Sequence, residues 1–552
     1  MNKRLLCLLQ AVLPAVVLQA TAQLLVDGRP AMLDATGDTL LATVGPTAYG
    51  TDATLRLSQS GGWLLKAVEG RPCSGDTLCT FPALKGDKGY SVAMVSPEGA
   101  QRDLTLMFTS LPLLRLEGTF GPAYSNGRFT LCQADKDAAQ TLDVRARWRG
   151  GSTNQPNKHK RNYRLEFDQD VSFFSLRSDD DWVLDAGQVD LFRVRNLVAA
   201  RLWSDMAPPP YYADDKPNAR TAPRGEVVEL FLNDRYQGIY TLLEPIDRKQ
   251  MKLAKADTLA GIVKGALWKA TGYGHATMWS VDDLCDEDSE TWDTFEAKYP
   301  KLEDLGHTTW EPLHSAISFV VNATDDDFCA GVATRFDLPV VRDFFLFTSV
   351  LCAIDNVGKN IYWAVYDQTA DQRLTPALWD MDITAGQRTA ERWNPDYSSP
   401  ELDMGPGINL VHRLLETNAC GFADSCVARY RQLRLGVLSL DSLQARYRQM
   451  ARTLADAGAD LRDERRWQGD TDLYGYGLDL SQEADYICQW IERRLRHLDS
   501  SDFPDLFHTS GLAAHSEATR RATGWHNLQG QPIDRPTRPG VYLHQGRKVV
   551  VK

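Results

Sequence analysis

Two short segments of the chain carry side chains whose types and spacing could do chemistry. Asp355 and Asn360 stand in the pattern D-x-x-x-x-N, and Asp380 and Asp382 follow an apolar, strand-like run at 374–378. Phosphoryl transfer uses such groups. A carboxylate orients or deprotonates the attacking hydroxyl, and an amide oxygen and a later carboxylate bind the Mg²⁺ that bridges the nucleotide phosphates. Short patterns often arise by chance, so the first segment also fits a plain helix-to-loop turn and the second an Asx turn or a calcium loop.

The composition narrows the classes of protein that this chain can be. Its 552 residues are too many for a single hydrophobic core, so we expect about two or three domains. Hydrophobic residues make up 43% and charged residues 24%, which is ordinary globular usage. The formal net charge of -12 gives no electrostatic support to nucleic-acid binding, whereas binding of ATP needs only local cations and metal ions.

The N-terminus has the composition of a secretory signal. Lys3 and Arg4 precede an apolar stretch at 5–18, and Ala20-Thr-Ala22 fits a cleavage site. An uncleaved anchor helix is the alternative, which is less favoured because the stretch is short and interrupted. We therefore expect an exported protein without a transmembrane segment, located extracellularly, at the cell surface or in the periplasm.

Nine of the ten cysteines follow this segment. An oxidising compartment permits disulfides. Cys73 with Cys79 and Cys420 with Cys426 are the favoured local pairs, because each pair encloses a short loop containing Gly and Asp. The odd number leaves at least one free thiol.

Residue periodicity predicts a β-rich half followed by a helix-rich half. This order indicates an α+β fold, in which a cleft can form between the two lobes. Alternation predicts strands at 111–116, 141–148, 160–167 and in a 227–243 hairpin, and helical periodicity predicts helices at 190–203, 340–354, 440–461 and 483–498. The predicted parts are a signal peptide at 1–22, a β-rich leader domain at 23–110, a central domain at 111–505, and a linker with a C-terminal β tail at 506–552.

Six segments of the central domain occur in a fixed order: Arg147–Thr153, Lys160–Leu165, Arg195–Asn196, Gly238–Glu244, Asp355–Asn360 and Trp379–Asp382. Together they resemble the CotH-type (spore-coat-protein-H-like) atypical protein kinases. The resemblance implies a bilobal, protein-kinase-like α+β domain, preceded here by a small all-β domain and followed by a short β tail. The tail resembles the C-terminal sorting modules of exported Bacteroidota proteins, which implies the export machinery as a partner.

The resemblance also implies roles for the catalytic and metal-binding residues. Asp355 would accept the proton of a substrate hydroxyl, and Lys359 beside it could reach the γ-phosphate of ATP. Asn360 and Asp380 would bind Mg²⁺ or Mn²⁺, with Asp382 as the alternative to Asp380. Two carboxylates and an amide oxygen suit such hard cations.

For the nucleotide, the resemblance implies that Lys160 contacts the phosphates, with the neighbouring Arg161 as the alternative, and that Glu244 lies near the adenine. The turn containing Arg149, Gly150 and Ser152 could present backbone N–H groups to phosphate. The alternatives are that Lys160 belongs to a solvated basic face and that the glycines only form a tight turn. The chain departs from typical protein kinases in two ways: it has no G-x-G-x-x-G, and its 190–203 helix has no Glu to pair with the lysine.

Three functions fit these observations. The first is an exported, metal-dependent kinase that transfers the ATP γ-phosphate to Ser or Thr of cell-surface or co-secreted proteins. The second is a catalytically inactive protein of the same fold that acts as a surface adhesin or binding protein, and ATP-dependent labelling separates these two. The third is a glycoside hydrolase that uses Asp355 and Asp380 as a carboxylate pair, for which sugar release without ATP is the signature.

Overall fold

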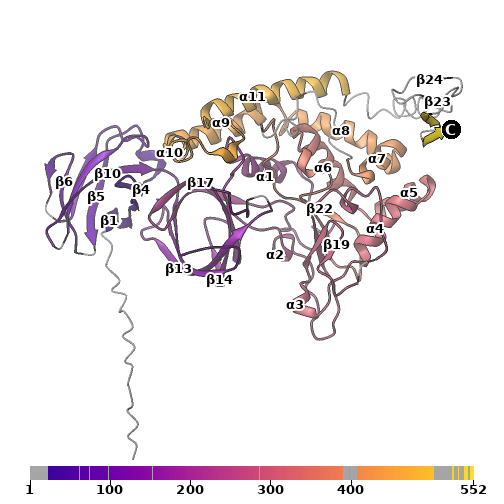
Figure 1. The fold of residues 1–552 in the computed structure, drawn as a ribbon, viewed down its shortest axis with the longest axis horizontal. Helices are drawn as coiled ribbons and strands as arrows, with labels where there is room; N and C mark the ends of the chain where they lie inside the picture. Colours follow the sequence, from indigo (N-terminus) through magenta and orange to yellow (C-terminus); the bar gives the residue numbers. More distant parts are fainter. Residues whose placement is uncertain are drawn as a thin grey trace, which may run out of the picture.

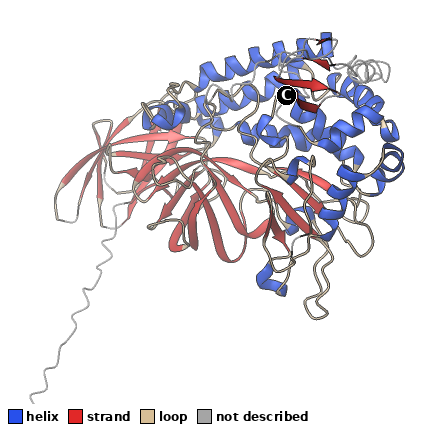
Figure 2. Cartoon of the chain, turned by 45° about the vertical axis from the view of Figure 1, so that its right-hand side comes forward, coloured by secondary structure: helices blue, strands red, loops and turns tan. Residues whose placement is uncertain are grey.

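The computed structural model describes residues 23–388 apart from positions 61, 74, 97, 152 and 285, then residue 397, residues 407–502, and four short strands between 525 and 551. The predicted signal peptide and Ser152 lie outside the described residues. The described chain has a mixed α+β fold, which confirms the predicted fold class, while the bilobal arrangement stays a prediction. Most strands lie in one half of the molecule and most helices in the other, where a smaller sheet lies among them (Figure 2).

The N-terminal part consists of two β-sheets around one apolar core (Figure 1). The sheets have the orders β2-β1-β5-β8 and β3-β4-β10-β9-β6-β7. Buried residues such as Leu57, Phe81 and Phe108 fill this core. The strands are β1 (Gln23–Val26), β2 (Arg29–Pro30), β3 (Met32–Asp34), β4 (Thr39–Thr43), β5 (Ala53–Ser60), β6 (Leu64–Val68), β7 (Arg71–Pro72), β8 (Thr77–Phe81), β9 (Tyr90–Val95) and β10 (Gln101–Thr109).

A closed barrel of order β11-β12-β13-β14-β15-β17-β16 follows. The parallel pairing of β11 with β16 closes it. Aromatic side chains including Phe129, Phe173 and Trp182 are fully buried in the core that these strands share, so the barrel interior is packed. The strands are β11 (Leu113–Glu117), β12 (Ser125–Cys132), β13 (Gln140–Arg149), β14 (Asn162–Ser172), β15 (Ser178–Asp185), β16 (Gly225–Leu232) and β17 (Arg235–Leu243).

The helix-rich half is built around a 5-stranded sheet of order β19-β20-β18-β21-β22. Its strands are β18 (Ala266–Ala270), β19 (Thr291–Trp292), β20 (Phe295–Tyr299), β21 (Ile361–Val365) and β22 (Thr375–Leu378). The helices are α1 (Arg195–Met206), α2 (Arg248–Met251), α3 (Leu302–Leu305), α4 (Glu311–Asn322), α5 (Asp325–Gly331), α6 (Leu338–Leu351), α7 (Asn409–Thr417), α8 (Phe422–Arg434), α9 (Leu440–Asp456), α10 (Ala459–Arg466) and α11 (Leu480–His497). α6 is apolar on nearly all sides and is buried against β22.

α10 joins the helices to both β-rich parts. Arg462 on α10 donates to Gly86 O of the N-terminal sheets at 2.8 Å and forms an ion pair with Glu229 of the barrel at 2.7 Å. Trp467 just after α10 donates to Gln237 O at 3.0 Å. In Figure 1, α9, α10 and α11 accordingly run along one side of the molecule, past the barrel.

Near the C-terminus, β23 (Trp525–His526), β24 (Pro532–Ile533), β25 (Gly540–His544) and β26 (Arg547–Val551) form a separate 4-stranded sheet of order β24-β23-β25-β26. A sorting role for this sheet stays a prediction. Within the residues that the structure describes, no helix combines the length and the apolar character needed to cross a membrane.

Neither predicted local disulfide is formed, because Cys73, Cys79, Cys420 and Cys426 are free thiols. Burial raises the pKa of the Cys79 thiol, and the neighbouring Cys73 thiol raises it further, so these two predicted partners lie together. The other predicted pair is not preformed. Cys426 is buried on α8, whereas Cys420 is exposed and its sulfur lies 4.0 Å from Cys329 O.

Candidate active site

Asp355 stands at the centre of a small hydrogen-bonded group just beyond α6. Its Oδ1 lies 2.7 Å from Lys359 Nζ and accepts from the Tyr273 hydroxyl at 3.2 Å, and its Oδ2 accepts from Asn360 Nδ2 at 2.9 Å. Burial raises the pKa of Asp355, Lys359 opposes that shift, and Asp380 adds to it. The structure therefore brings together Asp355, Lys359, Asn360 and Asp380.

The pairing of β21 with β22 explains why the two sequence segments meet. Ile361 lies opposite Leu378, so the residues just before β21 and just after β22 leave the sheet at the same edge. Asn356 Nδ2 donates to Trp379 O at 2.8 Å and fastens the two segments together. Asn360 and Asp380 both have φ in the left-handed region, at 54° and 61°. A non-glycine residue keeps such a conformation only when its surroundings enforce it, and these conformations concentrate at functional sites.

Another carboxylate, Asp185, joins the group from the barrel. Asn196, near the start of α1, donates to Asp185 Oδ2 at 2.8 Å and accepts from Met381 N at 3.0 Å, so it connects the end of β15 to the Asp380 segment. Burial raises the pKa of Asp382 well above its ordinary value, and the charges of Asp380, Asp185 and Asp355 raise it further. Asp185, Asp355, Asp380 and Asp382 thus lie close enough together for the first three charges to disfavour ionisation of Asp382.

Two cations border the carboxylates. Arg149, at the end of β13, places its guanidinium 5.0 Å from the centre of the Trp379 ring. Burial lowers the pKa of Arg149, and Asp380 opposes that shift. Lys269 on β18 belongs to the same neighbourhood: burial and then the Arg149 charge lower its pKa to about 8, while Asp380 opposes the shift. An anionic ligand at Asp380 would therefore lie near Arg149 and Lys269.

Lys160, the predicted phosphate lysine, is fully buried elsewhere. Its ammonium donates to Ile239 O at 2.7 Å and to Asp463 Oδ1 at 3.0 Å, and Asp463 also binds Arg193 at 2.7 Å. Burial lowers the pKa of Lys160 to about 7. These partners belong to the junction between the barrel and α10, so contact with a nucleotide would require Lys160 to leave them, and that role stays a prediction.

The Glu244 carboxylate also already accepts hydrogen bonds from a neighbouring side chain and from the backbone. It lies just after β17, is 1% exposed, and accepts from Arg224 at 3.0 Å and from Arg177 N at 2.7 Å. Its predicted role near the adenine stays a prediction. Gly150 has φ +102, and a Cβ there would lie 2.2 Å from Thr153 Oγ1, so the turn after Arg149 requires glycine. Ser152 of this turn lies outside the described residues.

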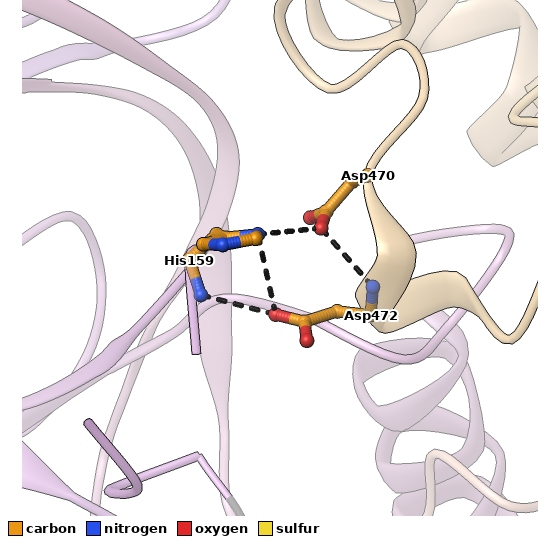
Figure 3. A group of neighbouring side chains, drawn as sticks. All are labelled: His159, Asp470 and Asp472. Carbon is orange, nitrogen blue, oxygen red and sulfur yellow. Dashed lines mark hydrogen bonds and ion pairs between the residues drawn. The ribbon is translucent and has the colours of Figure 1, made fainter. Parts of the chain in front are cut away.

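Two other clusters contain side chains of the types that bind metal ions. In both clusters, basic side chains of the protein already contact the carboxylates. His159, Asp470 and Asp472 meet between the start of β14 and the segment after α10 (Figure 3). His159 Nδ1 lies 2.8 Å from Asp470 Oδ1, and Lys158 Nζ lies 3.0 Å from Asp472 Oδ1. The second cluster, Asp170, Asp179 and Asp180, surrounds the ammonium of Lys249 at 3.2, 2.7 and 2.6 Å. The first arrangement therefore connects the segment before β14 to the segment after α10, and the second connects β14 and β15 to α2.

Sequence reasoning missed Asp185, Lys269 and Tyr273. The first two carried a weak signal. Asp185 ends the apolar run Trp182-Val-Leu, and Lys269 is the single charge in the apolar strand Ala266–Ala270. A charged residue within or directly after a buried strand needs a partner, which makes it a candidate for a site. Tyr273 carried no such signal.

A comparison with known protein families identifies the family to which this region belongs. A protein-family model described as "CotH kinase protein" matches residues 146–498. This range is more than half of the chain and contains every residue of the carboxylate cluster. No curated protein gave a significant match.

Proposed function

Because the chain belongs to the CotH kinase family, we propose that it is an exported phosphotransferase that moves the γ-phosphate of ATP to Ser or Thr hydroxyls of cell-surface or co-secreted proteins. The observation that carries this proposal is the joining of Asp355, Asn360 and Asp380 at one edge of the β21–β22 sheet. In phosphoryl transfer, alignment and charge neutralisation do most of the work, and these residues have the required types.

Asp355 is the group that receives the acceptor proton. Its two oxygens are held by Tyr273, Lys359 and Asn360, so the carboxylate has a fixed orientation before substrate arrives. Lys359 lies next to it, and its ammonium can contact the phosphate while the phosphate is transferred. The acceptor hydroxyl would donate its proton to Asp355 as the oxygen attacks phosphorus.

The residues fit a divalent metal ion. Asp380 and Asp382, with Asn360 and Asp185 beside them, offer oxygen ligands. Burial and then the neighbouring carboxylate charges raise the pKa of Asp382, and a bound Mg²⁺ or Mn²⁺ would offset both effects. When bound, the metal supplies neutralisation of phosphate charge. Arg149 and Lys269 are the cations placed to bind the remaining phosphate oxygens.

The test is transfer of label from γ-labelled ATP to the protein itself and to a generic protein acceptor, with Mg²⁺ or Mn²⁺, for the full chain. Asp355→Asn and Asp380→Asn are run beside it, with Asp499→Asn as a matched carboxylate change outside the site. Metal-dependent labelling that is lost in the first two variants and kept in the third supports the proposal. ATP binding without any transfer by the wild type would favour the inactive binding protein of the same fold.

A further inference from the structure

A strongly basic hollow lies beside α2. It has a volume of about 430 Å³, and its lining includes Lys216, Arg248, Lys249, Lys252, Lys255 and Tyr366 but no acidic residue. In a chain with a net charge of -12, such a concentration of positive charge is not a consequence of overall composition. Its ligand is therefore expected to be an anion.

Contacts between three separate segments fix the walls of this hollow. The Tyr212 ring, in the segment that carries Lys216, stacks on Tyr366 with centroids 4.8 Å apart. The Tyr212 hydroxyl donates to Met251 O at the end of α2 at 3.0 Å, and Ala254 N donates to Tyr366 O at 3.0 Å. The three segments that carry the cations are thus held together before any ligand binds, which reduces the entropy lost on binding.

Only one of the five cations already has its charge paired. Lys249 is bound by Asp170, Asp179 and Asp180, so it contributes mainly its aliphatic stem to the hollow. The other four form no ion pair within the part of the chain that the structure describes: Lys216, Arg248, Lys252 and Lys255. Arg248 makes only a long contact with Leu253 O at 3.5 Å and approaches the Tyr299 ring. Four uncompensated cations around one small space favour a ligand with more than one negative charge.

The hollow is separate from the carboxylate cluster. β21 begins directly after Asn360, in the cluster, and Tyr366, in the hollow, follows the end of the same strand. Six extended residues span about 20 Å. A ligand in the hollow therefore does not occupy the site proposed for phosphoryl transfer.

We propose that this hollow binds the phosphate group of a phosphoserine or phosphothreonine on a protein that the enzyme has already modified. The identity of the ligand rests on the proposed function, because that reaction would produce such groups. A phosphate monoester carries about -1.5 to -2 charges on one compact tetrahedral group, which matches several converging monovalent cations better than a single carboxylate does. Binding there would hold a modified substrate on the enzyme while another hydroxyl reaches Asp355.

The experiment measures binding of a fluorescent phosphoserine peptide with uncharged flanks to the full chain by anisotropy, without ATP. The unphosphorylated peptide and its Ser→Glu version are compared, and inorganic phosphate is the competitor. The test variant is Lys216→Gln/Lys255→Gln. The control variant Lys66→Gln/Lys85→Gln makes the same charge change at exposed positions of the N-terminal sheets. Thermal unfolding checks that both variants fold.

We expect the phosphopeptide to bind more tightly than both other peptides. The test variant should lose about tenfold or more in affinity, as for loss of a charge-assisted hydrogen bond, and the control should lose little. Equal binding of all three peptides, or equal loss in both variants, overturns the proposal. Competition by inorganic phosphate with no preference for the phosphopeptide also overturns it, since the hollow would then be a site for free phosphate. The γ-phosphate transfer assay on the same proteins separates the two proposals. The test variant should keep the basal transfer of the wild type. If the wild type itself shows no transfer, this result counts against the proposed function and not against binding of phosphate in the hollow.

Discussion

Lys160 Nζ lies 3.0 Å from Asp463 Oδ1, and both side chains are fully buried. Arg193 and Ile239 N bind the same carboxylate, so this group connects the segment before β14, β17 and the segment before α1 to α10. Lys160 therefore stabilises the junction between the barrel and the helices.

We predict that Lys160→Met lowers the free energy of unfolding by about 2–3 kcal/mol, because buried Asp463 and Ile239 O lose a hydrogen-bond donor while Arg193 still pairs with Asp463. Denaturant unfolding of the full chain measures this change. Lys136→Met is the control: Lys136 pairs with Asp135 at the exposed surface, and its loss should change stability by about 1 kcal/mol or less. If Lys160 instead contacts ATP phosphates, the variant would lose ATP affinity at nearly unchanged stability.

We predict that Asp355→Asn lowers the rate of phosphate transfer by about 10²–10⁴-fold, because the acceptor hydroxyl loses its proton acceptor. Lys359→Met should change the pH dependence. The Lys359 charge lowers the pKa of Asp355, so its removal raises that pKa and moves the acidic limb of the kcat/KM profile to higher pH. Tyr273→Phe is the matched change, with a smaller shift in the same direction. An acidic limb that stays in place in both variants would show that Asp355 is not the titrating base.

The helix at 340–354 shows what could be predicted from sequence and what could not. Apolar periodicity predicted it correctly as α6, but the helix ends at Leu351 because Cys352 adopts a left-handed φ of 47° and the chain continues into the turn that carries Asp355. Periodicity carries no information on that change. The predicted helix at 440–461 is likewise two helices, α9 and α10, interrupted at Gly458 with φ +68. There the glycine was a readable signal.

Site residues could be predicted where they lie in a short sequence motif. They could not be predicted where their role depends on neighbours that only the fold brings close. Asp355, Asn360 and Asp380 could be named because each lies in a short motif next to a buried element. Asp185 and Lys269 acquire their place only when β15 and β18 are brought to the same edge as β21. The closed barrel had the same limit, because its closure depends on the pairing of β11 with β16, more than a hundred residues away along the chain.

We predict that Asp382→Asn raises the free energy of unfolding of the metal-free protein at neutral pH by about 1 kcal/mol or more. The folded-state pKa of Asp382 is raised, so the stability that this group contributes is present below its ordinary pKa and is lost as the pH rises through the raised one. The amide removes that loss. The variant should also gain less stability from added Mg²⁺ or Mn²⁺, which thermal unfolding with and without chelator measures.

Asp499→Asn is the control of opposite sign. Arg434 and Tyr430 lower the pKa of Asp499 against the effect of burial, so replacing it should reduce stability at neutral pH and leave the effect of metal unchanged. Equal responses to metal in wild type and Asp382→Asn would count against a metal site at this carboxylate.

We predict that ATP affinity falls as the pH rises through about 8, the pKa of Lys269, because this lysine is a cation below that value and neutral above it. Lys269→Arg should keep its affinity over the same range, since a guanidinium stays protonated. Nucleotide binding to the full chain is measured between pH 7 and pH 9 for both proteins, and about a tenfold loss is expected in the wild type alone, as for loss of one charge-assisted hydrogen bond. A parallel decline in both proteins would mean that another group causes the pH dependence and that Lys269 does not contact the phosphates.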